Sequence, residues 1–420
     1  MPRKRTPHDR LQIELAHALG FPDYPTDNTA EPYINYITNE CVGRTLDGHI
    51  QLLVRIVKYF QDESLTVRSI QSFLDSMSIS TDVEYFADTK AGSQTRREVV
   101  EDTVLCTIGI WTMMLSSFRL LPVAGERVRR VTLAYSLYAQ RPSNPGRQPY
   151  GESVCGLIQG SGLLPSTSIA NHGCQHNPGT SSVLQNCLSQ RFLDDLDSLE
   201  SLSIRSTRLN AYTLNVFGAV DIMWTHNLSR HMLLSKRGGQ QILEIFALPC
   251  ALSATSLTPE LVGLSRELAQ EVRESYSLLF NAWPTSTQHT RLVNIFCMGS
   301  ICLCWSCSAQ RCRRKAIAMC KRFNNHSKHG ANSSRYDPLL AILMSNTSSD
   351  WTPDSFPNLW SRIVILEQHL QAAKPWSIWV LFRDRRDTLQ FWTFLFATVV
   401  VLLTVLQVAL GVAQVIGSFT

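Results

Sequence analysis

Four cysteines within eleven positions form the densest group of reactive side chains in the sequence. The stretch ICLCWSCSAQRC contains Cys302, Cys304, Cys307 and Cys312. Cys304 and Cys307 have the spacing of a zinc knuckle, but no second pair with this spacing follows. Thiols beside basic residues near a membrane are also typical of acylation sites, and Cys302, Cys304 and Cys307 are the candidates. A second membrane segment over 292–310 and an ordinary surface segment remain open.

Two further clusters contain residue types that bind metals. NHGCQHN places His172, Cys174 and His176 in one loop, but a closed zinc site needs a fourth ligand. FLDDLDSLE has three carboxylates between Asp194 and Asp197, which would suit Mg²⁺, but no second carboxylate motif accompanies them. We therefore expect a polar loop and a solvated helix face, with no metal and no cofactor.

The sequence contains no familiar catalytic motif. G-x-S-x-G, H-E-x-x-H, P-loop and dinucleotide-binding patterns are all missing. The Gly-Ser-Gly of 160–162 is interpreted as a turn. We assign no catalytic residue and expect a non-enzymatic interaction or regulatory protein that binds a protein partner. The alternative is a membrane-bound enzyme that acts on a lipid or another apolar substrate.

The C-terminal region predicts a membrane anchor. Thr388–Thr420 are 33 consecutive residues without Asp, Glu, Lys, Arg or His. A helix over Leu389–Gln414 would be about 39 Å long at ~1.5 Å per residue. Because this exceeds a hydrocarbon core of ~30 Å, we predict a transmembrane helix over 389–415 and a lipid bilayer as partner.

The residues around this span predict its orientation. Arg383, Arg385 and Arg386 precede the span, and no charged side chain follows it. Positive charge favours the cytosolic side. The N-terminal MPRKRTPHDR is basic and leads into no apolar signal-peptide core. We therefore expect a single-pass, tail-anchored protein with a cytosolic body.

The approach to the span has aromatic residues at regular spacing. Trp376, Trp379 and Phe382 recur every three residues, as on one face of a short helix. Such rings suit the headgroup layer, and the three arginines just named would face anionic lipid. Packing of this face on the body is the alternative.

Small residues suggest self-association through the anchor. Ala409, Ala413 and Gly417 recur every four residues, which allows close approach of two membrane helices. A homodimer through this face is therefore a hypothesis.

Composition fits a packed body. The 420 residues are 44% hydrophobic and 17% charged, enough for one large domain or two ordinary ones. The net charge of +5 is mild and regional, because no acidic residue falls between Glu274 and Asp337. We expect no nucleic-acid partner. The twelve cysteines are expected to be reduced in the cytosol.

Hydrophobic periodicity predicts a mainly helical fold. In GHIQLLVRIVKYF, Ile50, Leu53, Val54 and Val57 mark one helix face. Residues 141–179 are expected to be irregular. Further helices are predicted over 67–77, over 184–199, from Pro259 to Phe280 with Thr258 as cap, and over 357–373 with Leu359, Ile363, Leu366 and Leu370 buried. A longer central helix is predicted from Arg96 to a stop at Pro122. Its middle, 103–117, is almost wholly apolar and is expected to be buried, with a membrane helix as the alternative.

One region changes to a two-residue period. Tyr212, Leu214 and Val216 alternate, and the pattern resumes after Gly218 and again in QQILEIFALP. We predict a small antiparallel sheet near 209–249. The fold class is mainly α with this sheet, a helical cytosolic body and one C-terminal transmembrane helix. The expected divisions are a body over 1–290, a basic Cys-rich segment over 291–336, a helix and juxtamembrane segment over 337–388, and the span.

Two stretches carry a resemblance to other proteins. LNVFGAVDIMWTHNLSRHMLL and KPWSIWVLFRDRRDTLQFWTFLF are similar to segments of uncharacterised, C-terminally membrane-anchored proteins of filamentous ascomycete fungi. Trp224–Thr225 with Leu228 and His231, and the 376–392 approach to the anchor, carry the likeness, which extends over most of the chain beyond Arg96. The resemblance implies a fungal source and a membrane location, and it assigns no functional residue.

Overall fold

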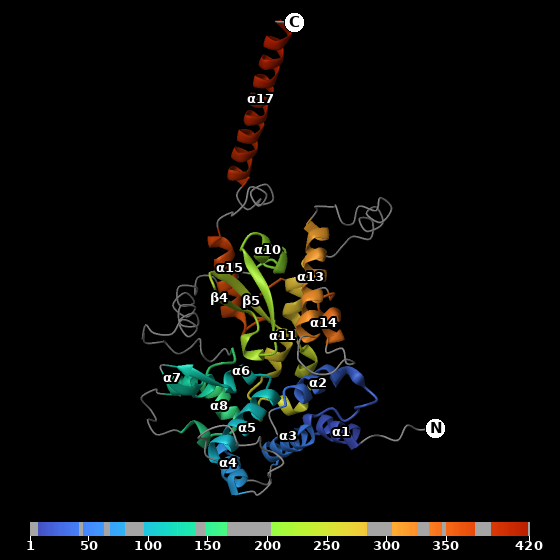
Figure 1. Ribbon diagram of the computed structural model, residues 1–420, viewed down its shortest axis with the longest axis vertical. Helices are drawn as coiled ribbons and strands as arrows, with labels where there is room; N and C mark the ends of the chain where they lie inside the picture. The colour runs from blue at the N-terminus through green and yellow to red at the C-terminus, as the bar shows by residue number, and fades with distance from the viewer. Residues whose placement is uncertain are drawn as a thin grey trace, which may run out of the picture.

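The computed structural model describes residues 7–41, 45–62, 68–79, 96–123, 125–139, 148–165, 203–283, 305–325, 336–346, 350–373 and 388–418. This part of the chain is mainly helical, as the sequence predicts, and it has two small sheets, of which the sequence predicts only the one near 209–249. Helices α1–α8 form one half of the body, and a three-stranded sheet with α10–α15 forms the other (Figure 1). One cluster of buried apolar side chains includes residues of both halves, so the body has a single core.

Helix α3 (Leu46–Gln61) shows why the first half is helical. The hydroxyl of Thr45 accepts a hydrogen bond from the N–H of Gly48 at 3.0 Å and caps the helix. Its predicted apolar face is buried, while Arg55 and Lys58 are exposed. Other helical segments of this half are α1 (Pro7–Leu19), η1 (Asn28–Ala30), α2 (Glu31–Asn39), α4 (Ile70–Ile79), α6 (Leu115–Phe118), α7 (Arg130–Ala139), η3 (Pro149–Gly151) and α8 (Val154–Gly160).

Helix α5 (Arg96–Trp111) is the predicted central helix, and every residue from 103 to 115 is buried. It ends well before Pro122, which corrects the predicted stop. The chain turns at Met113, with φ of 56°, and Pro122 lies in a hairpin. Strand β1 (Leu120–Val123) pairs antiparallel with β2 (Glu126–Arg129). An exposed strand edge tolerates proline because no ladder N–H is needed there.

The larger sheet has the strand order β3 (Val220–Thr225), β5 (Gln240–Phe246), β4 (Leu233–Arg237). The hairpin between β4 and β5 turns at Gly238 and Gly239, whose φ values of 56° and 90° suit a tight two-residue turn. Strand β3 is parallel to β5, so the expectation of an all-antiparallel sheet is wrong. The turn η6 (Leu228–Arg230) leads from β3 to β4, which lies on the other side of β5.

Residues predicted as the first strand form helix α10 (Ala211–Val216). The side chain of Asn210 accepts from the N–H of Thr213, and the hydroxyl of Thr213 accepts from the N–H of Asn210, both at 3.0 Å. This reciprocal cap favours a helix start. Tyr212, Thr213 and Leu214 are all buried, so the apparent alternation does not separate a buried face from an exposed one.

The second half also corrects one helix start and confirms one stripe. Helix α11 (Arg266–Phe280) begins after Ser265, whose hydroxyl caps it, and not at Pro259. All four predicted stripe residues of helix α15 (Trp360–Ala372) are buried. Further helical segments of this half are η7 (Pro249–Ser253), η8 (Thr255–Leu257), α13 (Trp305–Asn325) and α14 (Pro338–Leu343).

Helix α13 brings the basic, Cys-rich stretch into the body. The indole N–H of Trp224 on β3 donates to the carbonyl of Ala316 at 3.0 Å, and Ala316 and Cys320 belong to the core. The expectation of irregular chain over 141–179 is wrong for α8, which Ser153 caps. The helix predicted over 184–199 lies outside the described residues.

Candidate functional site

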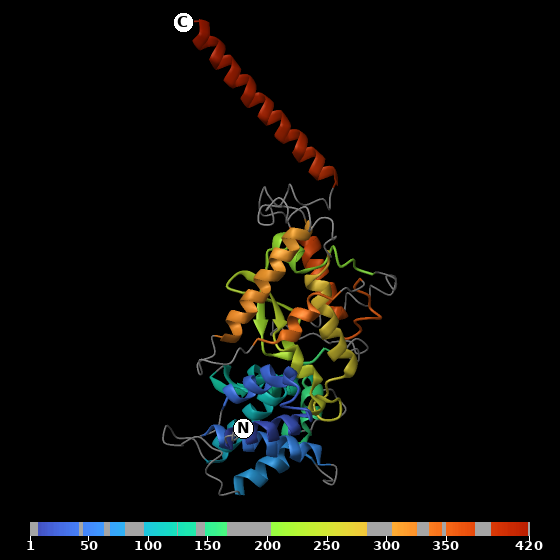
Figure 2. The same ribbon diagram turned by 90° about the vertical axis from the view of Figure 1, so that its right-hand side faces the viewer.

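The C-terminal helix α17 (Thr388–Ser418) is long and apolar enough to span a membrane. Its stretch Phe396–Gln414 has a mean hydropathy of 2.4, and none of it is buried. In the described part of the chain it is the one helix with these properties. Figures 1 and 2 show it extending away from the body. The predicted membrane-interface residues, from Trp376 to Arg386, lie outside the described residues.

A pocket of about 290 Å³ opens where the two halves of the body meet. This volume is close to the lower limit for ligand pockets, ~300 Å³. Two of its apolar rim residues, Val123 and Leu137, are 40% and 49% exposed, and outside α17 only one other large apolar side chain is exposed among the described residues. The apolar wall comes from the β1–β2 hairpin, α7, β4 and the turn after α8, with Leu121, Val128, Leu133, Ala134, Leu233 and Leu163.

Three arginines and no acidic residue line the same pocket: Arg130, Arg230 and Arg362. The guanidinium of Arg362 donates to the carbonyl oxygens of His231 and Ser229, the latter at 2.9 Å. Arg362 is 6% exposed, and burial together with the charge of Arg230 lowers its pKa to about 10. These two carbonyl contacts fix the guanidinium at the edge of η6.

The nearest carboxylate, Glu244 on β5, accepts hydrogen bonds from more than one arginine side chain. Arg230 donates two hydrogen bonds to it, and Arg237 donates a third at 3.2 Å. Burial raises the pKa of Glu244, but the hydrogen bonds and charges of Arg230 and Arg237 outweigh this and lower it overall. Glu244 is therefore ionised at neutral pH and is already bound to these partners.

Arg130, the first residue of α7, has no such partner. Its guanidinium forms no hydrogen bond or ion pair with another residue in the part of the chain that is described, although the charge of Glu244 acts on it. Partial burial and the nearby charge of Arg230 lower its pKa. One carboxylate, Glu244, thus faces the four guanidiniums of Arg130, Arg230, Arg237 and Arg362, which leaves an excess of positive charge beside the apolar wall.

A serine and a histidine lie at catalytic distance elsewhere, but they are structural. Nε2 of His231 lies 2.8 Å from Oγ of Ser275, and Nδ1 accepts the N–H of Phe246 at 3.2 Å. The neutral ring therefore carries its proton on Nε2 and donates it to Ser275, which is opposite to activation of a nucleophile. Burial and the charge of Arg362 lower the pKa of His231 to about 3. Both side chains are at most 1% exposed, so substrate has no access.

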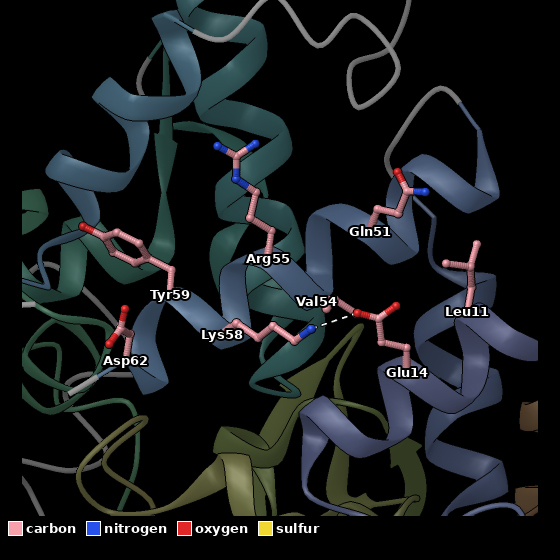
Figure 3. Close-up of a pocket in the computed structure, with 8 residues that line it drawn as sticks. All are labelled: Leu11, Glu14, Gln51, Val54, Arg55, Lys58, Tyr59 and Asp62. Atoms are coloured by element: carbon pink, nitrogen blue, oxygen red, sulfur yellow. Dashed lines mark hydrogen bonds and ion pairs between the residues drawn. The ribbon is translucent and has the colours of Figure 1, made fainter. Parts of the chain in front are cut away.

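A larger groove of about 450 Å³ lies between α1 and α3. Figure 3 shows the ion pair of Lys58 with Glu14, 2.8 Å apart, at its centre, and Arg55 extending away from this pair. Both paired side chains are more than half exposed, and such pairs contribute only ~0–1 kcal/mol. This open, charged groove offers a ligand little desolvated surface, so the less open pocket beside α7 is the better candidate site.

Most residues singled out from the sequence lie outside the described part of the chain. Cys302, Cys304, the 172–176 cluster and the 194–197 carboxylates are among them. Cys307 is described and is 7% exposed, and the start of α13 packs near Trp283 and Tyr212 through Trp305. Within the described ranges, no three His, Cys, Asp or Glu residues are placed to hold a metal ion.

Sequence reasoning missed the pocket. Ser161 and Gly162, interpreted only as a turn, line it, and Gly162 needs its φ of 59°. Of the residues on which the predicted resemblance rests, Trp224, Leu228 and His231 have structural roles. Trp224 binds α13, the N–H of Leu228 donates to the carbonyl of Met113 at 2.8 Å, and His231 binds Ser275.

Comparison with known proteins found no matching family model, no matching curated protein and no matching solved structure. The resemblance to anchored fungal proteins stays a prediction.

Proposed function

We propose that the protein is a membrane-tethered interaction or regulatory protein whose helical body works at a bilayer surface. The observation that carries this proposal is α17, which has a 19-residue apolar stretch that is not buried against the body. Exposure of so much apolar surface is unfavourable in water and favourable in lipid. The three arginines before the span favour a cytosolic body.

Protease protection tests this topology. Protease added to sealed membranes that contain the protein should remove nearly the whole body and leave a short anchor fragment. A lumenal marker that stays intact controls for leaky membranes. A large protected N-terminal fragment would show that the body lies on the other side and would overturn the tail-anchor proposal.

The approach to the anchor is proposed to contact lipid directly through Trp376, Trp379, Phe382 and the arginines that follow. Each arginine near an anionic surface contributes ~1 kcal/mol, and salt screens this attraction. A body cut at Thr388 should bind anionic vesicles weakly and release them at high salt. Binding that is absent, or that salt does not change, argues against this contact.

A homodimer through the small residues of α17 is proposed in the same membrane. Ala409 and Ala413 lie one helical turn apart, which suits close helix packing. Ala413→Ile should reduce energy transfer between labelled chains in bilayers, whereas Val408→Ile, on another face of the helix, should not. An unchanged signal in the Ala413 variant would exclude this interface.

A membrane-bound enzyme acting on an apolar substrate is the second candidate, because the pocket beside α7 combines an apolar wall with arginines. Its lining contributes guanidiniums and the hydroxyls of Ser161 and Ser229. These hydroxyls are bonded to the carbonyl of Ile158 and the side chain of Asn227. Turnover of a lipid by the purified protein, lost in Ser161→Ala or Ser229→Ala, would favour the enzyme.

A further inference from the structure

We infer that the pocket between α7, the β1–β2 hairpin and η6 binds an amphiphile with a single apolar chain and an anionic headgroup. Leu121, Leu133 and Leu233 would contact the chain, and Arg130 would pair with the headgroup. This inference concerns the body alone and does not depend on the tether or its orientation.

The headgroup is assigned by charge complementarity. The pocket lining contains three guanidiniums and no carboxylate, and Glu244 behind it already accepts from Arg230 and Arg237. Removing the guanidinium of Arg130 partly from water without a hydrogen-bonding partner, and beside the charge of Arg230, costs free energy, which an incoming anion would offset. Carboxylate and phosphate both accept two hydrogen bonds from one guanidinium, so both sources share this chemistry.

The apolar chain is assigned by the wall and the rim. The lining side chains are mostly aliphatic, and the exposed Val123 and Leu137 extend the apolar surface to the opening. A cavity of about 290 Å³ holds part of a chain and leaves the rest along this rim. A neutral apolar ligand would leave Arg130 unpaired, and a small anion without a chain would leave the wall empty.

Photo-crosslinking locates the ligand in the full-length protein, reconstituted in neutral phosphatidylcholine nanodiscs. The probe is dodecanoic acid with a diazirine in its chain. The expected crosslinks fall on peptides that contain 121–139 or 161–163, and excess dodecanoate competes them away. Crosslinks confined to α17 would show membrane partition alone and would overturn the inference.

Competition by other twelve-carbon amphiphiles tests the headgroup. Dodecanoate and dodecyl phosphate should each compete at least tenfold better than dodecanol or dodecyltrimethylammonium. Stronger competition by dodecyl phosphate assigns a lipid phosphate, and stronger competition by dodecanoate assigns a fatty acid. Equal competition by dodecanol or by the cation overturns the role of the arginines.

Variants test the residues. Arg130→Gln should weaken competition by dodecanoate about tenfold, the usual effect of losing one charge-assisted hydrogen bond. Arg127→Gln, on exposed strand β2 and outside the pocket, is the matched control. Leu133→Trp should fill the pocket and abolish the crosslink. An unchanged crosslink in a folded Leu133→Trp protein, or an equal loss in Arg127→Gln, would contradict the inference. If Leu133→Trp fails to fold, the comparison of Arg130→Gln with Arg127→Gln still tests the inference.

Discussion

The carboxylate of Glu271 on α11 lies 2.7 Å from the N–H of Leu359 and 2.6 Å from the side-chain amide of Asn358, which are 88 and 87 residues away in sequence. It also accepts the N–H of Asn358 at 3.1 Å. The N-cap position of α15, Leu359, has no capping side chain of its own. Glu271, at 2% exposed, therefore supplies the acceptors that the start of α15 lacks.

Replacement of Glu271 should destabilise the body. Glu271→Ala removes the acceptor of the buried N–H of Leu359 and of the half-buried N–H of Asn358, and we expect the free energy of unfolding to fall by ~2–4 kcal/mol. Urea unfolding of the detergent-solubilised protein measures this. Glu267→Gln, exposed on the same helix, should change it by less than ~0.5 kcal/mol. Equal stability of the two variants would show that α15 does not depend on this cap.

Local periodicity predicted the helices whose faces it marks. The stripe at Ile50 and Val57 and the one at Ile363 and Leu370 are buried as expected, because burial of such a face is what stabilises a helix in a protein. The predicted strand at Tyr212 is wrong because the cap at Asn210 favours a helix there and because four consecutive residues, 211–214, are buried. At this segment, tertiary packing and the helix cap determined the structure, and the two-residue hydrophobic period did not.

The candidate site could not be predicted in the same way. Leu121, Ser161, Arg230 and Arg362 come together only through the packing of the hairpin, α8, η6 and α15. No short spacing joins residues so distant in sequence. The parallel pairing of β3 with β5 was hidden for the same reason, since strand order depends on long-range contacts. The apolar C-terminal helix was predictable because its signal is contiguous.

Acid should destabilise the body through buried histidines. Burial lowers the pKa of His49 to about 4, and its Nε2 lies 3.2 Å from the carbonyl oxygen of Ile37. Below pH ~6.5 His49 is protonated in the unfolded chain but stays neutral in the folded protein. The free energy of unfolding therefore falls as the pH drops toward 4. The full shift corresponds to ~3 kcal/mol.

His49→Gln isolates this contribution. The variant should show a smaller loss of unfolding free energy between pH 7 and pH 4.5 than the wild type. The variant is compared with the wild type because other groups also make stability depend on pH. Burial raises the pKa of Asp337 and of Glu271, so these two carboxyls make the folded protein more stable as the pH falls. His17→Gln, which removes an exposed histidine, is the control. Identical pH profiles for wild type and His49→Gln would refute the assignment.

Thiol reactivity should follow burial. Cys41 is exposed, whereas Cys250 and Cys320 are at most 2% exposed, and burial raises the pKa of Cys320 to about 12. N-ethylmaleimide should therefore label Cys41 rapidly in the folded protein and the other two only after unfolding. Peptide mass spectrometry reads this out. Fast labelling of Cys320 in native protein would mean that α13 leaves the body.

The body should fold without its anchor. No described residue of α17 belongs to the buried core, and none of its stretch Phe396–Gln414 is buried. A protein that ends at Asp387 should therefore be soluble without detergent and should unfold cooperatively in urea. Its midpoint should match that of the detergent-solubilised full chain, because the free energy of unfolding comes from core burial. The control, a shorter chain that ends at Phe356, lacks α15 and should aggregate. Loss of cooperative unfolding in the longer protein would show that α17 contributes to the core after all.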